Sequence, residues 1–137
     1  MPAAALSIRV PAEAEQMARV RTELAEYARG VGMSEAAVED VQTVATEACG
    51  NSIKHAYDGS PGGVLEVEAD ADEGELRLTV RDYGSGIRLR PRTRTSLPGL
   101  HAGLSIIGAL SNSFRLSSRR RRGTELEARL PLAGVGC

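Results

Sequence analysis

Hydrophobic and polar residues alternate in several short segments of the chain, and a two-residue period is typical of strands with one buried face. The alternation covers residues 6–10, 64–69 and 75–80. Polar segments separate residues 64–69 from 75–80, and residues 114–117 from 124–130, which predicts two antiparallel hairpins. The pattern therefore predicts five strands, the first of which stands alone.

Three other segments have apolar residues at the spacing of an α-helix. Residues 13–30 should form an amphipathic helix whose apolar positions are Met17, Val20, Leu24 and Ala28. Ser34 is a favourable N-cap for a second helix, which we expect to run to about Tyr57. Apolar residues within 104–110 mark a third helix.

The predicted elements follow one another in the order β-α-α-β-β-loop-α-β-β. Because the strands come in hairpins and the helices come separately, this order favours an α+β fold over a βαβ fold. We predict a two-layer α/β sandwich, in which a mixed, mostly antiparallel sheet carries about three helices on one face. A chain of 137 residues is most simply one domain, covering residues 1–137. Residues 88–99 lack periodicity, so we expect a mobile loop there that could act as a lid.

The composition is ordinary for a globular protein, with 42% hydrophobic and 26% charged residues. The net charge of −1 argues against a nucleic-acid-binding surface. We expect the arginine run at 119–122 to be a solvated turn, with contact to an acidic partner as the alternative. Cys49 and Cys137 fit a reducing compartment. Neither a signal peptide nor an apolar run of the ~18 residues that span a membrane is found, so we expect a soluble, cytoplasmic protein.

A row of polar residues interrupts the second predicted helix. Glu47, Asn51 and His55 recur every four residues, which places them on one helical face bordered by apolar positions. They could simply form an exposed stripe, but a carboxylate one turn from an amide also suits a general base beside a metal ligand. The small residues Gly50 and Ser52 would let a ligand approach the backbone. We expect His55 to close the helix, with a role near phosphates as the alternative.

Three glycine-containing segments could complete a site. Residues 82–87 (DYGSGI) follow a predicted strand, where the aspartate can accept a hydrogen bond and the glycines let a planar ligand lie close. Residues 99–104 (GLHAGL) open a predicted helix, and the free N–H groups of a helix N-terminus favour phosphate. Residues 123–124 begin the last strand. Taken alone, each segment also fits an ordinary turn or helix start.

Together, in this order and spacing, the segments resemble the nucleotide site of the GHKL (Bergerat-fold) ATPase and kinase superfamily. EACGNSIKHAY resembles its N-box, DYGSGI its D-x-G-x-G box, GLHAGLSII its second glycine box and GTELEARL its closing strand. The resemblance spans about residues 6–132 and is strongest to the anti-sigma-factor serine kinases of the RsbW and SpoIIAB type. Ser52 replaces the usual alanine of the N-box, a change that we expect to be minor. His101 stands where the second box usually has glycine.

The resemblance implies a role for the matching polar residues. Glu47 would be the general base that takes the proton from the attacking hydroxyl. Asn51 would ligate the Mg²⁺ ion that bridges the nucleotide phosphates. Asp82 would accept the exocyclic amine of adenine, and Thr124 would support that contact directly or through water.

The glycine boxes would surround the rest of the nucleotide. Gly84 and Gly86 would let the base pack against the backbone, and Ile87 would belong to the same part of the binding site. The phosphates would be bound by the second box, whose residues are His101, Ala102, Gly103 and Leu104. The implied cofactors are ATP and Mg²⁺.

Kinases of this type phosphorylate a serine of a STAS-domain anti-anti-sigma factor and also bind a sigma factor of RNA polymerase. The resemblance thus implies an ATP-dependent serine/threonine protein kinase that acts as an anti-sigma factor, without direct contact to nucleic acid or membrane; a homodimer is a further expectation. The alternative is a catalytically weak or inactive nucleotide-binding module that sequesters a sigma factor or a STAS protein. The altered second glycine box keeps this alternative open. An ATPase piece of a sensor kinase is a weaker third hypothesis, because both the first and the last strand of the fold are expected here.

Overall fold

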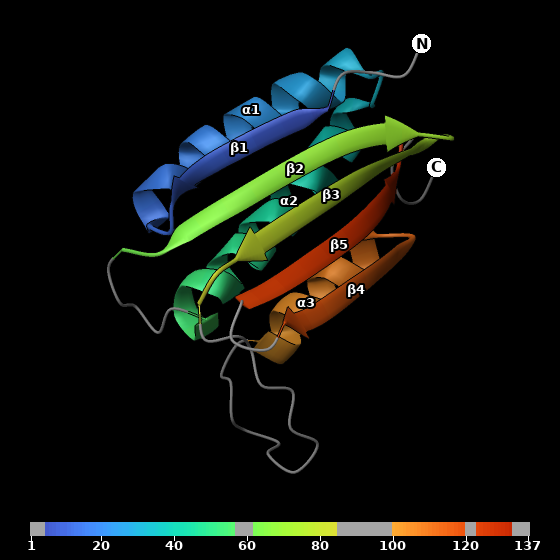
Figure 1. Cartoon of the computed structure of the whole chain (residues 1–137). Helices are drawn as coiled ribbons and strands as arrows, with labels where there is room; N and C mark the ends of the chain where they lie inside the picture. The colour runs from blue at the N-terminus through green and yellow to red at the C-terminus, as the bar shows by residue number, and fades with distance from the viewer. Residues whose placement is uncertain (1–4, 57–61, 85–99, 120–122, 133–137) are drawn as a thin grey trace.

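The computed structural model describes residues 5–56, 62–84, 100–119 and 123–132. The strands form one sheet in the order β1-β2-β3-β5-β4, and each of these pairings is antiparallel (Figure 1). The strands are β1 (Leu6–Pro11), β2 (Val64–Asp72), β3 (Glu75–Asp82), β4 (Ser113–Arg119) and β5 (Gly123–Pro131). Because β5 pairs with both β3 and β4, the last hairpin continues the sheet directly beside the first one.

The helices cover one face of the sheet (Figure 1). They are α1 (Met17–Gly30), preceded by a 3-10 turn (Ala14–Gln16); α2 (Glu35–Asn51), which continues into the π-helical turn η2 (Ser52–Ala56); and α3 (Leu100–Leu110). Ser34 caps α2 as predicted, since its hydroxyl accepts a hydrogen bond from the N–H of Ala37 at 3.1 Å. None of the described helices is both long and apolar enough to cross a membrane.

The predicted α+β class, the two layers and the order of the elements are confirmed. Several element boundaries differ from the prediction by a few residues, and two of the differences also concern backbone geometry. The second helix changes at Asn51 from α-helical to π-helical geometry instead of running uniformly to about Tyr57. The first hairpin turn consists of Glu73 and Gly74 alone, not of the longer segment DADEG, because both residues adopt the positive φ of a tight hairpin turn (51° and 81°).

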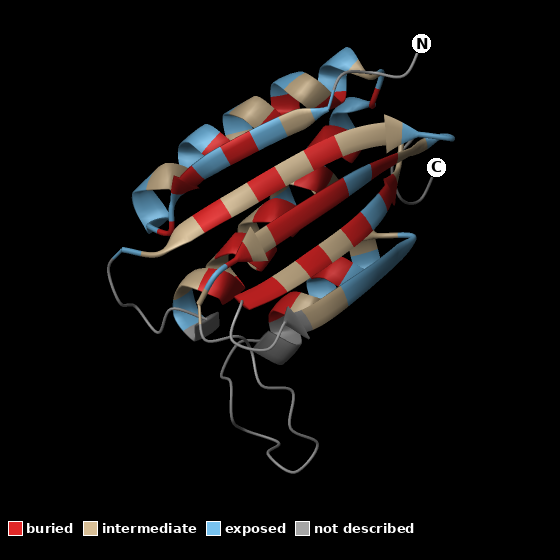
Figure 2. Cartoon of the chain, viewed as in Figure 1, coloured by how far each residue is buried: buried red, intermediate tan, exposed pale blue. Residues whose placement is uncertain are grey.

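The core lies between the helices and the sheet, and alternate residues of each central strand face it (Figure 2). In β3, for example, Leu76 and Leu78 are fully buried while Arg77 between them is exposed. The largest fully buried side chains come from both layers: Ile8, Leu24, Leu65, Leu76, Leu78, Ile107 and Leu130. Burial of each such side chain stabilises the fold by ~1.5–3 kcal/mol, so this apolar layer holds sheet and helices together.

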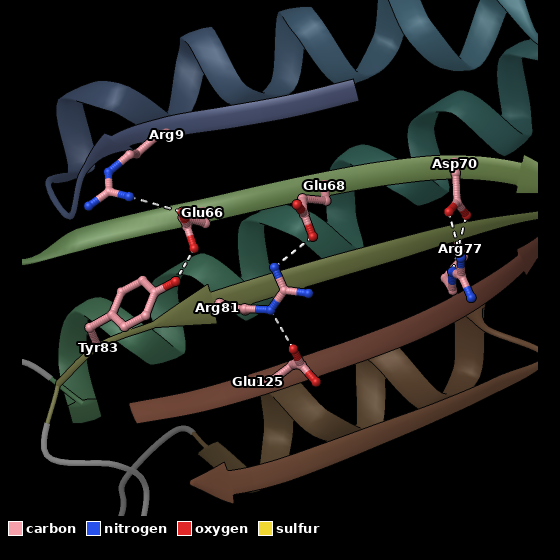
Figure 3. A network of polar contacts seen from close by, with 8 residues as sticks. All are labelled: Arg9, Glu66, Glu68, Asp70, Arg77, Arg81, Tyr83 and Glu125. Atoms are coloured by element: carbon pink, nitrogen blue, oxygen red, sulfur yellow. Dashed lines mark hydrogen bonds and ion pairs between the residues drawn. The ribbon is translucent and has the colours of Figure 1, made fainter. Parts of the chain in front are cut away.

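The opposite face of the sheet, which the described helices leave open, carries charged side chains (Figure 3). Arg81 of β3 lies between Glu68 of β2, at 2.6 Å, and Glu125 of β5. Arg77 of β3 pairs with Asp70 of β2 at 2.5 Å. Partly exposed ion pairs contribute ~1 kcal/mol or less each, so these contacts favour the correct strand register more than they add to overall stability.

Cys49 provides a test of the packing of α2. It is fully buried, and burial raises the pKa of its thiol to about 12. Because the thiolate is the nucleophile, we predict that at pH 8 the folded Cys137→Ser variant reacts with iodoacetamide roughly a hundredfold or more slowly than the same variant in urea. Mass spectrometry measures both rates. Equal rates would contradict the buried position of Cys49.

Candidate functional site

Four segments meet at one end of the sheet. They are the C-terminal end of α2 with η2, the end of β3, the beginning of β5 and the beginning of α3 (Figure 1). The predicted site residues lie on these segments in two groups, one around Asp82 and one around Glu47. The fold therefore brings together segments that are far apart in the sequence.

Asp82 is the last residue of β3 and continues the buried alternation of that strand, so its side chain lies on the core side of the sheet. Its exposed fraction is 0%. Oδ1 accepts hydrogen bonds from the backbone N–H of Thr124 at 3.0 Å and of Gly84 at 3.2 Å. Oδ2 accepts one from the hydroxyl of Ser52 at 2.7 Å. These donors offset the cost of burying the carboxylate and hold it in place.

Gly123 allows β5 to approach Asp82. A Cβ atom at position 123 would lie 1.9 Å from the backbone oxygen of Asp82 and 2.8 Å from its Oδ1 atom. The φ of Gly123 is also +103°, a conformation that residues with a Cβ rarely adopt. Glycine at this position thus places the N–H of Thr124 within hydrogen-bond distance of the carboxylate.

Glu47 and Asn51 lie one turn apart on α2 and contact Gly103 of α3. A Cβ atom at position 103 would lie 3.1 Å from Oε2 of Glu47, and 3.2 Å and 3.3 Å from the amide nitrogen and oxygen of Asn51. The glycine therefore lets the first turn of α3 approach both side chains. Since the first N–H groups of a helix have no partner within the helix, this arrangement can bind an anion between the two helices.

The amide of Asn51 has unused hydrogen-bonding capacity among the described residues. Asn51 is 8% exposed, and its Nδ2 atom makes no hydrogen bond to the part of the chain that the structure describes. A buried amide without a partner is costly, so a bound group would supply a missing interaction. Among the described residues, no three His, Cys, Asp or Glu side chains gather as they do in a metal cage.

Glu47 also lines a depression of about 360 Å³ between α1 and α2. The other lining residues are polar: Arg21, Glu39, Gln42, Thr43 and Thr46. A hydrogen bond at 3.3 Å from Nε2 of Gln42 to the backbone oxygen of Arg21 joins the two helices. A second molecule could therefore reach the carboxylate of Glu47 from the surface of α1 and α2.

The remaining predicted site residues are only partly described. Leu104 of α3 is half-buried and packs against the core. For His101 and Ala102, the structure describes the helical backbone of α3 but not the side chains. Other predictions lie outside the described residues, namely those for Gly86, Ile87 and the lid at 88–99.

Sequence reasoning missed one contact, that of Ser52. Ser52 was expected to be a minor replacement, yet it hydrogen-bonds Asp82; the only signal in the sequence was a hydroxyl where alanine is usual. His55 lies within η2, where the structure describes its backbone but not its side chain, so its predicted role at the helix end stays a prediction. Beside Gly50, no described atom lies within 4 Å of an added Cβ, so the space is open.

Comparison with known proteins gives a family match over most of the chain. Residues 10–130 match the family model described as the histidine kinase-like ATPase domain. The matched region includes both residue groups of the site, from Glu47 to Thr124.

Two curated relatives show the level of similarity. The chain is 32% identical to the serine-protein kinase RsbW of Listeria innocua over 108 residues, which cover 77% of this chain and 69% of that protein. It is 29% identical to an anti-sigma F factor of Clostridium botulinum over 96 residues, which cover 65% of this chain and 67% of that protein.

Solved structures share the fold. The structure of the RsbU and RsbW domains of a Mycobacterium tuberculosis protein superimposes with a TM-score of 0.67 at 23% identity, covering 93% of this chain. This chain spans 32% of that longer polypeptide. The histidine kinase domain of a blue-light activated kinase from Erythrobacter litoralis superimposes with a TM-score of 0.57 at 16% identity, covering 90% of this chain and 62% of that one. At these identities, the likeness establishes the fold alone.

The close contact of Gly123 with Asp82 leads to a stability prediction. Gly123→Ala should lower the free energy of unfolding by about 3 kcal/mol or more, because the added methyl group would overlap the backbone of Asp82. Gly74→Ala is the matched control: Gly74 also has a positive φ (81°), but no described atom lies within 4 Å of its added methyl, so its cost should stay near ~1 kcal/mol. Urea denaturation measures both values. Equal losses would mean that Gly123 matters for its backbone conformation alone.

Proposed function

Because the chain belongs to the histidine kinase-like ATPase domain family, we propose that it binds ATP with Mg²⁺ at this end of the sheet and transfers the γ-phosphoryl group to a protein serine. The observation that carries the proposal is the contact of Gly103 with Glu47 and Asn51. This contact brings together a carboxylate, an amide and a helix N-terminus. In phosphoryl transfer, such groups remove the proton, bind the metal and stabilise the charge, respectively.

In this proposal, the adenine base binds at the Asp82 group. The carboxylate accepts the exocyclic amine of the base, and the neighbouring Thr124 supports that contact. Gly84, whose N–H donates to Asp82, would let the base pack against the backbone because it has no side chain. Gly86 and Ile87 stay predicted members of the same half of the site.

The phosphates bind at the beginning of α3. Backbone N–H groups of His101, Ala102, Gly103 and Leu104 belong to the first turns of the helix. Anions are favoured there because the helix dipole is positive at that end and because the first N–H groups of a helix lack partners within it. The absence of a side chain at Gly103 keeps this turn close to Glu47 and Asn51.

The residues present fit a magnesium ion. Mg²⁺ prefers oxygen ligands and is commonly held by one or two protein groups together with substrate phosphates. Asn51 is a buried amide whose Nδ2 atom has no partner among the described residues, and rotation of the amide exchanges its nitrogen and oxygen positions. When bound, Mg²⁺ would neutralise charge on the phosphate oxygens.

Glu47 acts on the proton in the proposed reaction. Its carboxylate takes the proton of the attacking serine hydroxyl, the serine oxygen bonds to the γ-phosphorus, and the bond from the γ-phosphorus to the bridging oxygen breaks to leave ADP. The polar depression between α1 and α2 gives a second protein access to Glu47. The attacking serine therefore does not need to belong to this chain.

The relatives suggest the type of partner. One is named an anti-sigma F factor and another a serine-protein kinase, RsbW. We propose accordingly that the substrate is a STAS-domain anti-anti-sigma factor and that this protein also sequesters a sigma factor of RNA polymerase. Phosphorylation would then decide which of the two partners is bound.

Replacement of Glu47, the proposed general base, tests the reaction. With radiolabelled ATP, Mg²⁺ and a purified STAS-domain protein, Glu47→Gln should lower the rate of serine phosphorylation by roughly 10²–10⁴-fold, because the amide cannot accept the proton. Binding of ADP, measured by calorimetry, should change by less than about fivefold, since Glu47 is not assigned to the base or sugar.

Glu26→Gln is the control, because it removes a carboxylate from an exposed position on α1. It should leave both phosphorylation and ADP binding unchanged. Tight partner binding without any phosphate transfer by the unmodified protein would contradict the kinase proposal and favour a nucleotide-binding partner module. Failure to bind ADP would contradict the nucleotide site itself.

Gly103→Ala tests the phosphate half of the site. The added methyl group would press on Glu47 and Asn51 from 3.1–3.3 Å, so we predict a loss of phosphorylation rate of roughly tenfold or more. Gly108→Ala on the same helix is a matched control, because its methyl group would meet a ring carbon of Phe114 at the same 3.1 Å distance. Both variants should fold, as measured by circular dichroism. An equal loss of rate in both variants would assign the effect to helix packing.

A further inference from the structure

Ser52 makes a buried contact that its position in the sequence did not predict. Its hydroxyl donates to Oδ2 of Asp82 at 2.7 Å, and the two residues are 5% and 0% exposed. We propose that Ser52 is a positioning residue for base recognition, which orients the Asp82 carboxylate toward the exocyclic amine of an adenine base. This inference rests on the proposed nucleotide binding and assigns a residue that determines its base selectivity.

The geometry of the carboxylate supports this role. The terminal torsion of an aspartate is soft, so one fixed oxygen does not define the orientation of the carboxylate plane. The N–H groups of Thr124 and Gly84 hold Oδ1, and the hydroxyl of Ser52 holds Oδ2. With both oxygens held, the plane of the carboxylate is fixed before a ligand arrives. A hydrogen-bond acceptor fixed in this way loses less entropy when it binds its donor.

Ser52 is itself held in place by its own backbone. Its N–H donates to the carbonyl oxygens of Ala48 and Cys49 at the junction of α2 and η2. Successive residues of a helix point about 100° apart. Asn51 therefore contacts Gly103 of α3, while the next residue, Ser52, contacts Asp82 of β3. The junction thereby sets the position of the base half of the site relative to the phosphate half.

The proposal is tested with two nucleotides that differ in the exocyclic amine of the base. ADP carries the exocyclic amine, and purine riboside diphosphate lacks it; both are titrated calorimetrically with Mg²⁺ into the unmodified protein and into Ser52→Ala. We expect Ser52→Ala to weaken ADP binding by about tenfold and to leave binding of the amine-free nucleotide within about twofold. A merely structural role would not produce this difference between ligands.

Two further variants make the result specific. Ser111→Ala is the matched control, since it removes a buried hydroxyl for which the described residues offer no hydrogen-bond partner. It should leave both affinities unchanged. Ser52→Cys keeps the shape of the side chain with a slightly larger atom that is a weaker donor, so it should lose part of the preference for ADP even if Ser52→Ala folds poorly.

Each remaining outcome decides against the proposal. If Ser52→Ala weakens both nucleotides equally, Ser52 serves the fold and not base recognition. If ADP affinity is unchanged or rises, the hydroxyl does not orient the acceptor or competes with the amine for it. If the unmodified protein binds the amine-free nucleotide but not ADP, Asp82 does not accept a hydrogen bond from the exocyclic amine, and the proposal fails. If it binds neither nucleotide, the proposed function fails together with this inference.

Discussion

The arrangement of the candidate site depends on the burial of one carboxylate. Asp82 has no exposed surface, and a charge in such a position is tolerated only where hydrogen-bond donors surround it. The donors come from η2, from the residue that follows Tyr83 after β3, and from β5. Displacement of any of these segments would remove a donor from a buried charge. The carboxylate therefore couples the helix layer to two strands at the end of the sheet.

The end of α2 connects the two halves of the site. Asn51 and Ser52 are adjacent, yet one contacts α3 and the other contacts β3. The change from α-helical to π-helical geometry occurs between them. Such π-helical turns are often found at functional sites, where they redirect side chains that a regular helix would place elsewhere. Under the proposed function, this short backbone segment fixes the distance between the part of the site that binds the base and the part that binds the phosphates.

The fold by itself does not determine the reaction. Its structural neighbours include an RsbW domain and a histidine kinase domain, so the same layers occur in proteins with different names and domain arrangements. The proposal of a protein serine as the substrate rests on the site together with the name of a relative. Glu47 lies between the first turn of α3 and a polar depression on the surface of α1 and α2, where a second protein could present a hydroxyl.

Local patterns in the sequence determined the strands, the helices and the cap at Ser34, because each depends on residues close together in the chain. The four-residue period singled out Glu47 and Asn51, whereas Asp82 and the roles of all three came from the order of the glycine boxes. Only the tertiary structure decided that Ser52 bonds Asp82 and that position 123 must be glycine. Ser52 and Asp82 are 30 residues apart, and no local pattern records the distance between a helix end and a strand end. The approach of α2, β3 and β5 is set by packing of the whole core, which brings these segments within hydrogen-bond distance.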